Sequence, residues 1–334
     1  MSRRSILKAS VAAAAVGGFA SFRTRPARSA TVTLRIGNVQ APTHANSRAQ
    51  DVFKSELEKL SGGQFKVESY PNGQLGGIRP QVEATKAGIQ EMVVSNPAMM
   101  STFAKDMDVM NLLFMASSQQ KVWDAVEKGE LGKRLAVDAE KSGFVLLGWW
   151  ALGARHMLNN KRPINVPDDL KGSKMRVQVS PVWVKSMQAM GANPVSMDFV
   201  EVYGALQTGV IDGYENLFAD VYKGKFYEVV KYMSLTAHQY DLFNVFINKR
   251  IFDGYTPEQQ QMIRTAMNTA TAWQRKQQEA DQQEAQEALK KLLTMNEVSD
   301  ANRKLFAERC KPIWTESEQR LGKDLVQLAI KELT

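Results

Sequence analysis

Two arginines in the middle of the chain are the clearest candidates for chemistry. Arg176 lies in a predicted strand between Met175 and Val177, and Arg155 follows a continuous apolar run. Because alternate side chains of a strand point to opposite faces, Arg176 leaves the strand on the face opposite its apolar neighbours. A guanidinium held in this way can bind a carboxylate through two parallel hydrogen bonds. The alternative for each arginine is a surface position or a structural salt bridge.

Residues for other kinds of chemistry are scarce. The chain has one cysteine, which excludes an intramolecular disulfide and cysteine-based zinc or iron–sulfur sites. Its three histidines, His44, His156 and His238, lack the spacing of a metal site. The sequence also lacks the glycine-rich nucleotide motifs, the GxSxG motif and the haem motif CxxCH. We therefore expect no catalytic residue, metal or cofactor, and an exported cofactor-dependent oxidoreductase is the disfavoured alternative.

The net charge of +8 does not indicate a nucleic-acid partner. Six of the 43 basic residues lie in the first 30 residues, which contain no acidic residue, so the remainder has 37 basic against 35 acidic residues. The nearly neutral remainder has no excess of positive charge of the kind that binds a phosphate backbone.

The first 30 residues are typical of an export signal. Arg3, Arg4 and Lys8 precede the alanine-rich stretch Ala9–Ala20. This run of about 12 residues is too short to cross a bilayer as a helix. The paired arginines favour the twin-arginine type. We predict a signal peptide over residues 1–30, cleaved after Ser29 or Ala30, and a periplasmic mature protein.

The mature chain opens with alternating strands and helices. Alternating or apolar stretches predict strands at 31–37, 65–70 and 91–95, and helical spacing predicts helices at 47–60 and 79–87. This β-α-β-α-β order implies a parallel sheet with helices on its faces.

The second half of the chain contains the elements that position the two arginines. The apolar run 144–150 predicts a central strand, and we place the first crossing between two domains near residue 152. Between Thr256 and about residue 293 no helix breaker occurs, which predicts one long helix or two in tandem, without a coiled-coil dimer. Further strands are expected at 175–179, 210–212 and 241–248, with helices at 181–191 and 198–209.

Several segments resemble the solute-binding subunit of TRAP transporters, the DctP-type family. The longest is Met197–Asn216, MDFVEVYGALQTGVIDGYEN, and the similarity extends over nearly the whole mature chain. The other matching segments are Gly73–Gly77, Gly148–Ile164, Pro167–Gly172 and Lys174–Gln178.

The resemblance implies an α/β, two-lobed periplasmic solute-binding-protein fold, with a ligand cleft between the lobes and a long helix spanning both. Residues 31–152 with about 242–281 would form lobe 1. Residues 153–241 with about 282–334 would form lobe 2.

The resemblance also implies roles for single residues. Arg176 matches the arginine that pairs with the ligand carboxylate, and Arg155 matches a second arginine of the pocket. Asn216 matches an asparagine that hydrogen-bonds the ligand, and Phe199 matches an aromatic position that packs on it. Leu217 stands where many members have proline. Lobe 1 would add weaker, variable contacts from His44, Glu83 and Asn96.

We therefore expect a monomeric receptor that binds one small organic acid and delivers it to the TRAP membrane subunits. A C4-dicarboxylate would need a second cationic partner, whereas a sugar acid would need several neutral or acidic partners for its hydroxyl groups. The polar candidates include more of the second kind. A sugar acid such as a hexuronate is therefore favoured, with a C4-dicarboxylate or another small carboxylate as the alternative.

Overall fold

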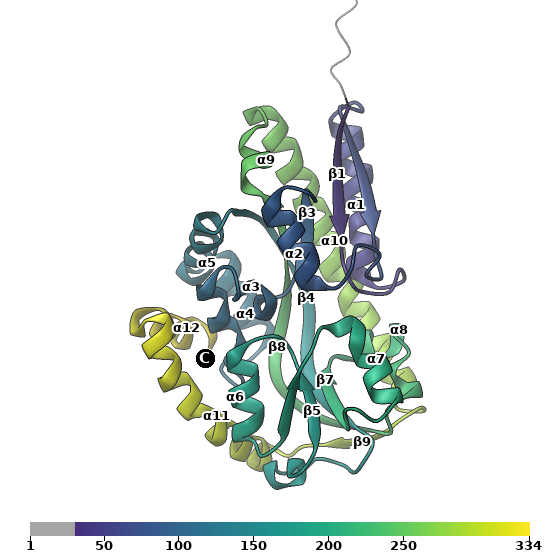
Figure 1. The fold of residues 1–334 in the computed structure, drawn as a ribbon, viewed down its shortest axis with the longest axis vertical. Coiled ribbons are helices and arrows are strands. Elements are labelled where there is room, and N and C mark those ends of the chain that lie inside the picture. The colour runs from purple at the N-terminus through teal and green to yellow at the C-terminus, as the bar shows by residue number, and fades with distance from the viewer. Residues whose placement is uncertain (1–30) are drawn as a thin grey trace, which may run out of the picture. The chain divides into compact units, whose positions relative to one another are not determined.

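The computed structural model describes residues 31–334, which form one mixed sheet covered by helices on both faces (Figure 1). The predicted signal peptide lies outside the described residues. The sheet has nine strands in the order β2-β1-β3-β8-β4-β7-β5-β6, with β9 paired to β8. The strands are β1 Val32–Gly37, β2 Phe65–Tyr70, β3 Met92–Ser95, β4 Phe144–Asn159, β5 Lys174–Val177, β6 Asn193–Ser196, β7 Gly213–Asn216, β8 Tyr232–Asn248 and β9 Thr294–Glu297.

The helices lie between these strands and at the C-terminus. They are α1 Ala45–Leu60, α2 Ile78–Ala87, α3 Pro97–Met100, α4 Gln119–Glu127, α5 Glu130–Lys141, α6 Pro181–Ala189, α7 Phe199–Gln207, α8 Phe218–Lys223, α9 Lys249–Asp253, α10 Pro257–Leu289, α11 Asp300–Leu321 and α12 Lys323–Leu333. Short 3-10 turns are η1 Lys105–Asn111, η2 Pro167–Leu170 and η3 Phe226–Glu228.

The first three strands confirm the predicted β-α-β-α-β order. Strand β1 pairs in parallel with both β2 and β3. Phe53 and Leu57 of α1 pack with Phe65 and Val67 of β2 in one buried cluster, to which α10 also contributes. Burial of such large apolar side chains supplies most of the favourable free energy of folding.

Two long antiparallel strands, β4 and β8, connect the two groups of shorter strands. Their pairing is irregular between Leu146 and Gly148, between Ala151 and Gly153, and between Arg155 and Met157. The sequence predicted only 144–150 and 241–248 of these strands. The remainder was missed because buried polar residues interrupt the apolar pattern there.

The predicted strand at 210–212 is wrong by a few residues, since the strand is β7, Gly213–Asn216. Val210 is 55% exposed. Tyr214, Glu215 and Asn216 of β7 are buried. Glu215 and Asn216 are polar, and only Tyr214 packs in an apolar cluster, against Phe226, so the apolar signal fell on the connection instead.

The long helix is a single α10 of 33 residues. It begins with a capping box between Thr256 and Gln259, and Pro257 occupies its first turn. It packs against α1, β4 and α8 and so follows both groups of strands (Figure 1). Among the described residues, no helix is long and apolar enough to cross a membrane.

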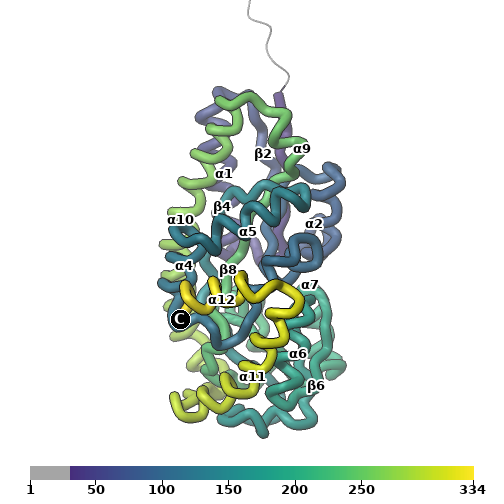
Figure 2. The backbone as a smooth tube through the Cα atoms, turned by 90° about the vertical axis from the view of Figure 1, so that its left-hand side faces the viewer, coloured from purple at the N-terminus to yellow at the C-terminus, as the bar shows by residue number. Residues whose placement is uncertain are grey.

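The C-terminal helix α12 packs back onto α4 and α5 (Figure 2). Leu325 and Val326 belong to the same buried cluster as Val122 and Leu131. The end of the chain therefore reaches a segment assigned above to lobe 1. The exact lobe boundaries stay a prediction.

Candidate ligand-binding site

A cavity lies where β4, β5 and β7 meet the N-terminal ends of α2 and α7. About 310 Å³ between these elements is free of protein atoms, a volume that includes open solvent at the mouth. Five of the seven predicted site residues line it: Asn96, Arg155, Arg176, Phe199 and Asn216. The other lining residues are Gln40, Ile78, Leu152, Gln178, Asp220 and Phe243.

Arg176 is held along one edge of its guanidinium and available along the other. Its Nε and Nη2 donate to the Met197 carbonyl oxygen at 3.0 and 2.8 Å. Its Nη1 lies 4.0 Å from Oε1 of Glu215, too far for a hydrogen bond. Burial lowers the pKa of Arg176 to about 10, and the attraction of Glu215 only partly opposes this effect. A further anion at Nη1 would therefore be stabilised.

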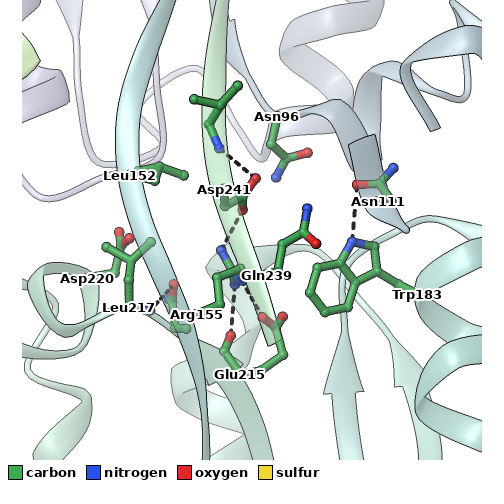
Figure 3. Close-up of polar contacts among 12 residues, drawn as sticks. Asn96, Asn111, Leu152, Arg155, Trp183, Glu215, Leu217, Asp220, Gln239 and Asp241 are labelled. Atoms are coloured by element: carbon green, nitrogen blue, oxygen red, sulfur yellow. Dashed lines mark hydrogen bonds and ion pairs between the residues drawn. The ribbon is translucent and has the colours of Figure 1, made fainter. Parts of the chain in front are cut away.

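Arg155 is instead part of a buried ion-pair network (Figure 3). Its Nε donates to the Glu215 carboxylate and its Nη2 donates to the Glu215 carbonyl oxygen at 2.9 Å. Its Nη1 donates to Oδ2 of Asp241 at 2.8 Å. Burial works against the charged form, but the two carboxylates outweigh it and raise the pKa of Arg155. Arg155 thus lines the cavity and also makes the structural salt bridge considered above.

Glu215 is the anion shared by this network. It is fully buried, and its Oε2 lies 3.6 Å from Nε2 of His238. Burial raises the pKa of Glu215, but Arg155 and His238 overcome that effect and the pKa is lowered. Glu215 therefore stays ionised, positions Arg155 through hydrogen bonds and attracts Arg176 through its charge.

The amide side chains add hydrogen-bonding groups to the cavity. Oδ1 of Asn96 accepts from the Met99 backbone N–H at 2.8 Å, as the N-cap of α3. Oδ1 of Asn216 accepts from the Leu217 backbone N–H at 2.9 Å. Within residues 31–334 neither amide NH₂ group donates a hydrogen bond, so both are free for a ligand. Oε1 of Gln178 is buried and lacks a partner among the same residues.

Two helix N-termini meet at the cavity. Asp198, the N-cap of α7, accepts from the Phe199 backbone N–H at 2.6 Å through Oδ1. Its Oδ2 lies 3.4 Å from the Arg79 backbone N–H in the first turn of α2. Ile78 and Phe199, the first residues of these helices, contribute an apolar wall.

His44 and Glu83 do not line the cavity. His44 is 1% exposed and N-caps α1, where its Nδ1 accepts from the Asn46 backbone N–H at 3.1 Å. Its Nε2 stands behind the cavity, 3.7 Å from Oδ1 of Asp220. Glu83 is half exposed and pairs with Arg79 at 3.0 Å. Any direct ligand contact of these two residues stays a prediction.

Two of the residues that sequence reasoning missed carried a usable signal. Gln178 lies two positions after Arg176 and therefore shares its face of the chain. Asp220 follows β7 within the first turn of α8, and ligands of open α/β sheets bind beyond strand ends. Burial raises the pKa of Asp220 to about 7, and the attraction of Arg155 opposes this only in part.

Fold and cavity together are those of a receptor that binds a small solute in a cleft. The chain belongs to the bacterial extracellular solute-binding protein family 7, DctP, whose pattern matches residues 36–320. It is 32% identical over 296 residues to the 2,3-diketo-L-gulonate-binding periplasmic protein YiaO of Escherichia coli, covering 88% of each chain.

Two solved structures are similar over most of the chain. One is the sugar acid binding protein DctPAm from Advenella mimigardefordensis in complex with galactonate, with 28% identity, a TM-score of 0.88, and coverage of 91% of this chain and 98% of that one. The other is a TRAP periplasmic solute-binding protein from Sulfurospirillum deleyianum with bound succinate, with 27% identity, a TM-score of 0.86, and coverage of 91% and 100%.

These findings confirm the predicted TRAP solute-binding family and its α/β fold with the long helix α10. They also confirm the periplasmic location and a small carboxylate as the class of ligand. The family does not consist of enzymes, and it implies TRAP membrane subunits as partners.

Proposed function

We propose that the protein is a periplasmic receptor for a sugar acid such as a hexuronate, which it delivers to a TRAP membrane transporter. The observation that carries this proposal is the unpaired edge of Arg176 in the cavity. A ligand carboxylate at Nη1 would supply the anion that this buried guanidinium lacks.

The other polar residues of the lining are suited to hydrogen-bond hydroxyl groups of a ligand rather than to bind a second ligand carboxylate. The amides of Gln40, Asn96, Gln178 and Asn216 offer both donors and acceptors. The relatives whose names include 2,3-diketo-L-gulonate and galactonate bind ligands of this kind. The relative with bound succinate keeps the C4-dicarboxylate as the second candidate.

We propose that binding closes two lobes around the ligand, with residues 31–152 and about 242–281 in lobe 1. Residues 153–241 and about 282–334 would form lobe 2. Closure would be a population shift, because a ligand moves this equilibrium only through contacts that it makes better in the closed state.

The test is a thermal-shift screen of the mature chain against organic acids, followed by calorimetric titration of each hit. A ligand at 100 times its Kd raises the free energy of unfolding by about 2.7 kcal/mol. Arg176→Ala should abolish the shift. The control is Arg309→Ala, which should not change it, because Arg309 is an exposed residue of α11 that pairs with Asp168. Absence of a shift with every sugar acid and every dicarboxylate would refute the proposal.

A further inference from the structure

Asp220 is a carboxylate of the cavity lining to which the protein supplies few donors. Its side chain is 6% exposed, and a side-chain hydrogen bond from Gln40 acts on it. The nearest basic group is Nε2 of His44, at 3.7 Å. A carboxylate can accept about four hydrogen bonds, so one amide donor leaves this side chain with unused capacity to accept hydrogen bonds.

Asp220 and Arg176 come from different elements that line the cavity. Arg176 lies on β5 and is held by the Met197 carbonyl oxygen just before α7. Asp220 lies on α8 and faces His44 at the N-terminus of α1. Strand β7, which carries Asn216, pairs with β5 on one side and with β4 on the other. A ligand anchored at Arg176 would therefore extend past Asn216 toward Asp220.

The cations near Asp220 are already used or uncharged. Arg155 donates to Glu215 and Asp241, so its charge is matched by two carboxylates. Burial lowers the pKa of His44 to about 4, and burial also lowers the pKa of His156 to about 3. Among the lining residues that the structure describes, Arg176 is thus the one cation without a hydrogen-bonded carboxylate.

We propose that Asp220 determines specificity by accepting a hydrogen bond from a ligand hydroxyl group and by excluding a second carboxylate from its end of the cavity. This inference rests on the proposed function and narrows the ligand to a hydroxylated monocarboxylate. A hydroxyl group donates to Asp220, whereas a second carboxylate beside Asp220 would be repelled with no free cation to offset it.

The groups around Asp220 support this role. His44 on α1, Arg155 on β4, Glu215 on β7 and the Gln40 amide are the charged or polar groups that face it. Burial raises the pKa of Asp220 to about 7, although Arg155 and Gln40 oppose this effect. Above neutral pH the side chain is ionised, and a hydrogen-bond donor from the ligand would then stabilise its buried charge. Titrations at pH 8 therefore measure the ionised side chain.

The experiment compares D-galacturonate, D-galactonate and succinate as probes, by calorimetric titration of the mature chain at pH 8. The wild type should bind at least one sugar acid roughly 10-fold more tightly than succinate. Asp220→Asn keeps the shape but removes the charge, so sugar-acid affinity should fall by roughly 10-fold and succinate affinity should rise. Asp220→Glu keeps the charge and should keep the preference for the sugar acid. The matched control is Asp124→Asn, the same change at an exposed residue of α4 that pairs with Lys128, and it should leave all three affinities unchanged.

Each outcome decides a separate point. An unchanged ratio of sugar-acid to succinate affinity in Asp220→Asn overturns the role of Asp220. A wild type that prefers succinate overturns it too, but leaves an organic-acid receptor standing. A wild type that binds none of the three probes and no other acid overturns the proposed function itself.

Discussion

At the scale of the residue, the two arginines of the cavity have different tasks. Arg176 is short of an anion, and its guanidinium is held by one carbonyl oxygen. Arg155 is matched by Glu215 and Asp241. The same residue type therefore supplies a binding group in one position and a structural group in the other.

This difference predicts separable effects of two substitutions. Arg176→Ala should lower ligand affinity by roughly 30-fold or more, because loss of one partner of a buried charge pair costs 2–5 kcal/mol. Arg155→Ala should lower the free energy of unfolding without ligand by about 3–5 kcal/mol, since it leaves Glu215 and Asp241 buried without their partner. Denaturant unfolding and calorimetric titration of both variants measure the two effects. Equal losses of stability in both would contradict the assignment.

The buried ionisable groups also predict how stability depends on pH. Burial lowers the pKa of His44 from 6.5 to about 4, so protonation of the unfolded chain reduces stability as the pH falls below 6.5. Asp220 acts in the opposite direction. Its pKa is raised from 3.8 to about 7, so its contribution to stability is present at low pH and is lost as the pH rises toward 7.

Asp220→Asn isolates the second contribution. Between pH 5 and pH 7 the free energy of unfolding of this variant should rise, relative to the wild type, by roughly 2 kcal/mol. Urea unfolding of both proteins without ligand at several pH values measures the difference. A difference that does not vary with pH would mean that the pKa of Asp220 is not raised in the folded protein.

At the scale of the element, the sequence predicted strands and helices well where burial is apolar and poorly where it is polar. Strand β2 and helix α6 follow from apolar alternation and from the Ser180 cap before Pro181. The ends of β4 and β8 and all of β7 did not follow, because buried polar side chains interrupt the apolar pattern there. In the same way, five site residues followed from the sequence and its resemblance, whereas the role of Asp241 depends on the pairing of the distant strands β4 and β8.

A row of glutamines on α10 supports the irregular part of β4. Gln274 accepts from the Ala151 backbone N–H at 2.7 Å and donates to the Ala151 carbonyl oxygen at 2.8 Å. One turn later, Gln278 donates to the Leu152 carbonyl oxygen at 3.0 Å. These side chains bond backbone groups of β4 beside the irregularity between Ala151 and Gly153, before the segment His156–Asn159 that pairs with β7.

Gln274→Leu should therefore destabilise the fold although it keeps the size of the side chain. It leaves a backbone N–H and a carbonyl oxygen of Ala151 without these partners, at a cost of about 2–4 kcal/mol in the free energy of unfolding. Gln261→Leu, on an exposed face of the same helix, should change it by less than about 0.5 kcal/mol. Equal effects in urea unfolding would show that the β4 contacts of Gln274 do not stabilise the fold.

At the scale of the whole molecule, α2 and α7 meet across the cavity from segments assigned to different lobes. Gly77 directly precedes α2, and a Cβ atom there would collide with the carboxylate of Asp198, the N-cap of α7. The backbone of Gly77 has φ −65 and ψ 176, which any residue can adopt. A side chain at position 77 would therefore be opposed by contact with the Asp198 carboxylate, which can move only at the cost of its capping contacts, and not by backbone strain.

Gly77→Ala should weaken ligand binding by hindering closure while leaving each half of the fold intact. If the substitution destabilises the closed state relative to the open state by about 1.4 kcal/mol, the apparent affinity falls about tenfold. Adding Asp198→Ser removes the colliding carboxylate but keeps a helix-capping side chain, so the double variant should recover part of the affinity. Gly204→Ala, where a Cβ meets open space, is the matched control and should bind like the wild type.

Calorimetric titration measures the affinities, and small-angle scattering measures whether ligand still compacts the molecule. A Gly77→Ala variant with unchanged affinity and unchanged compaction would show that the two helices need not meet when ligand binds.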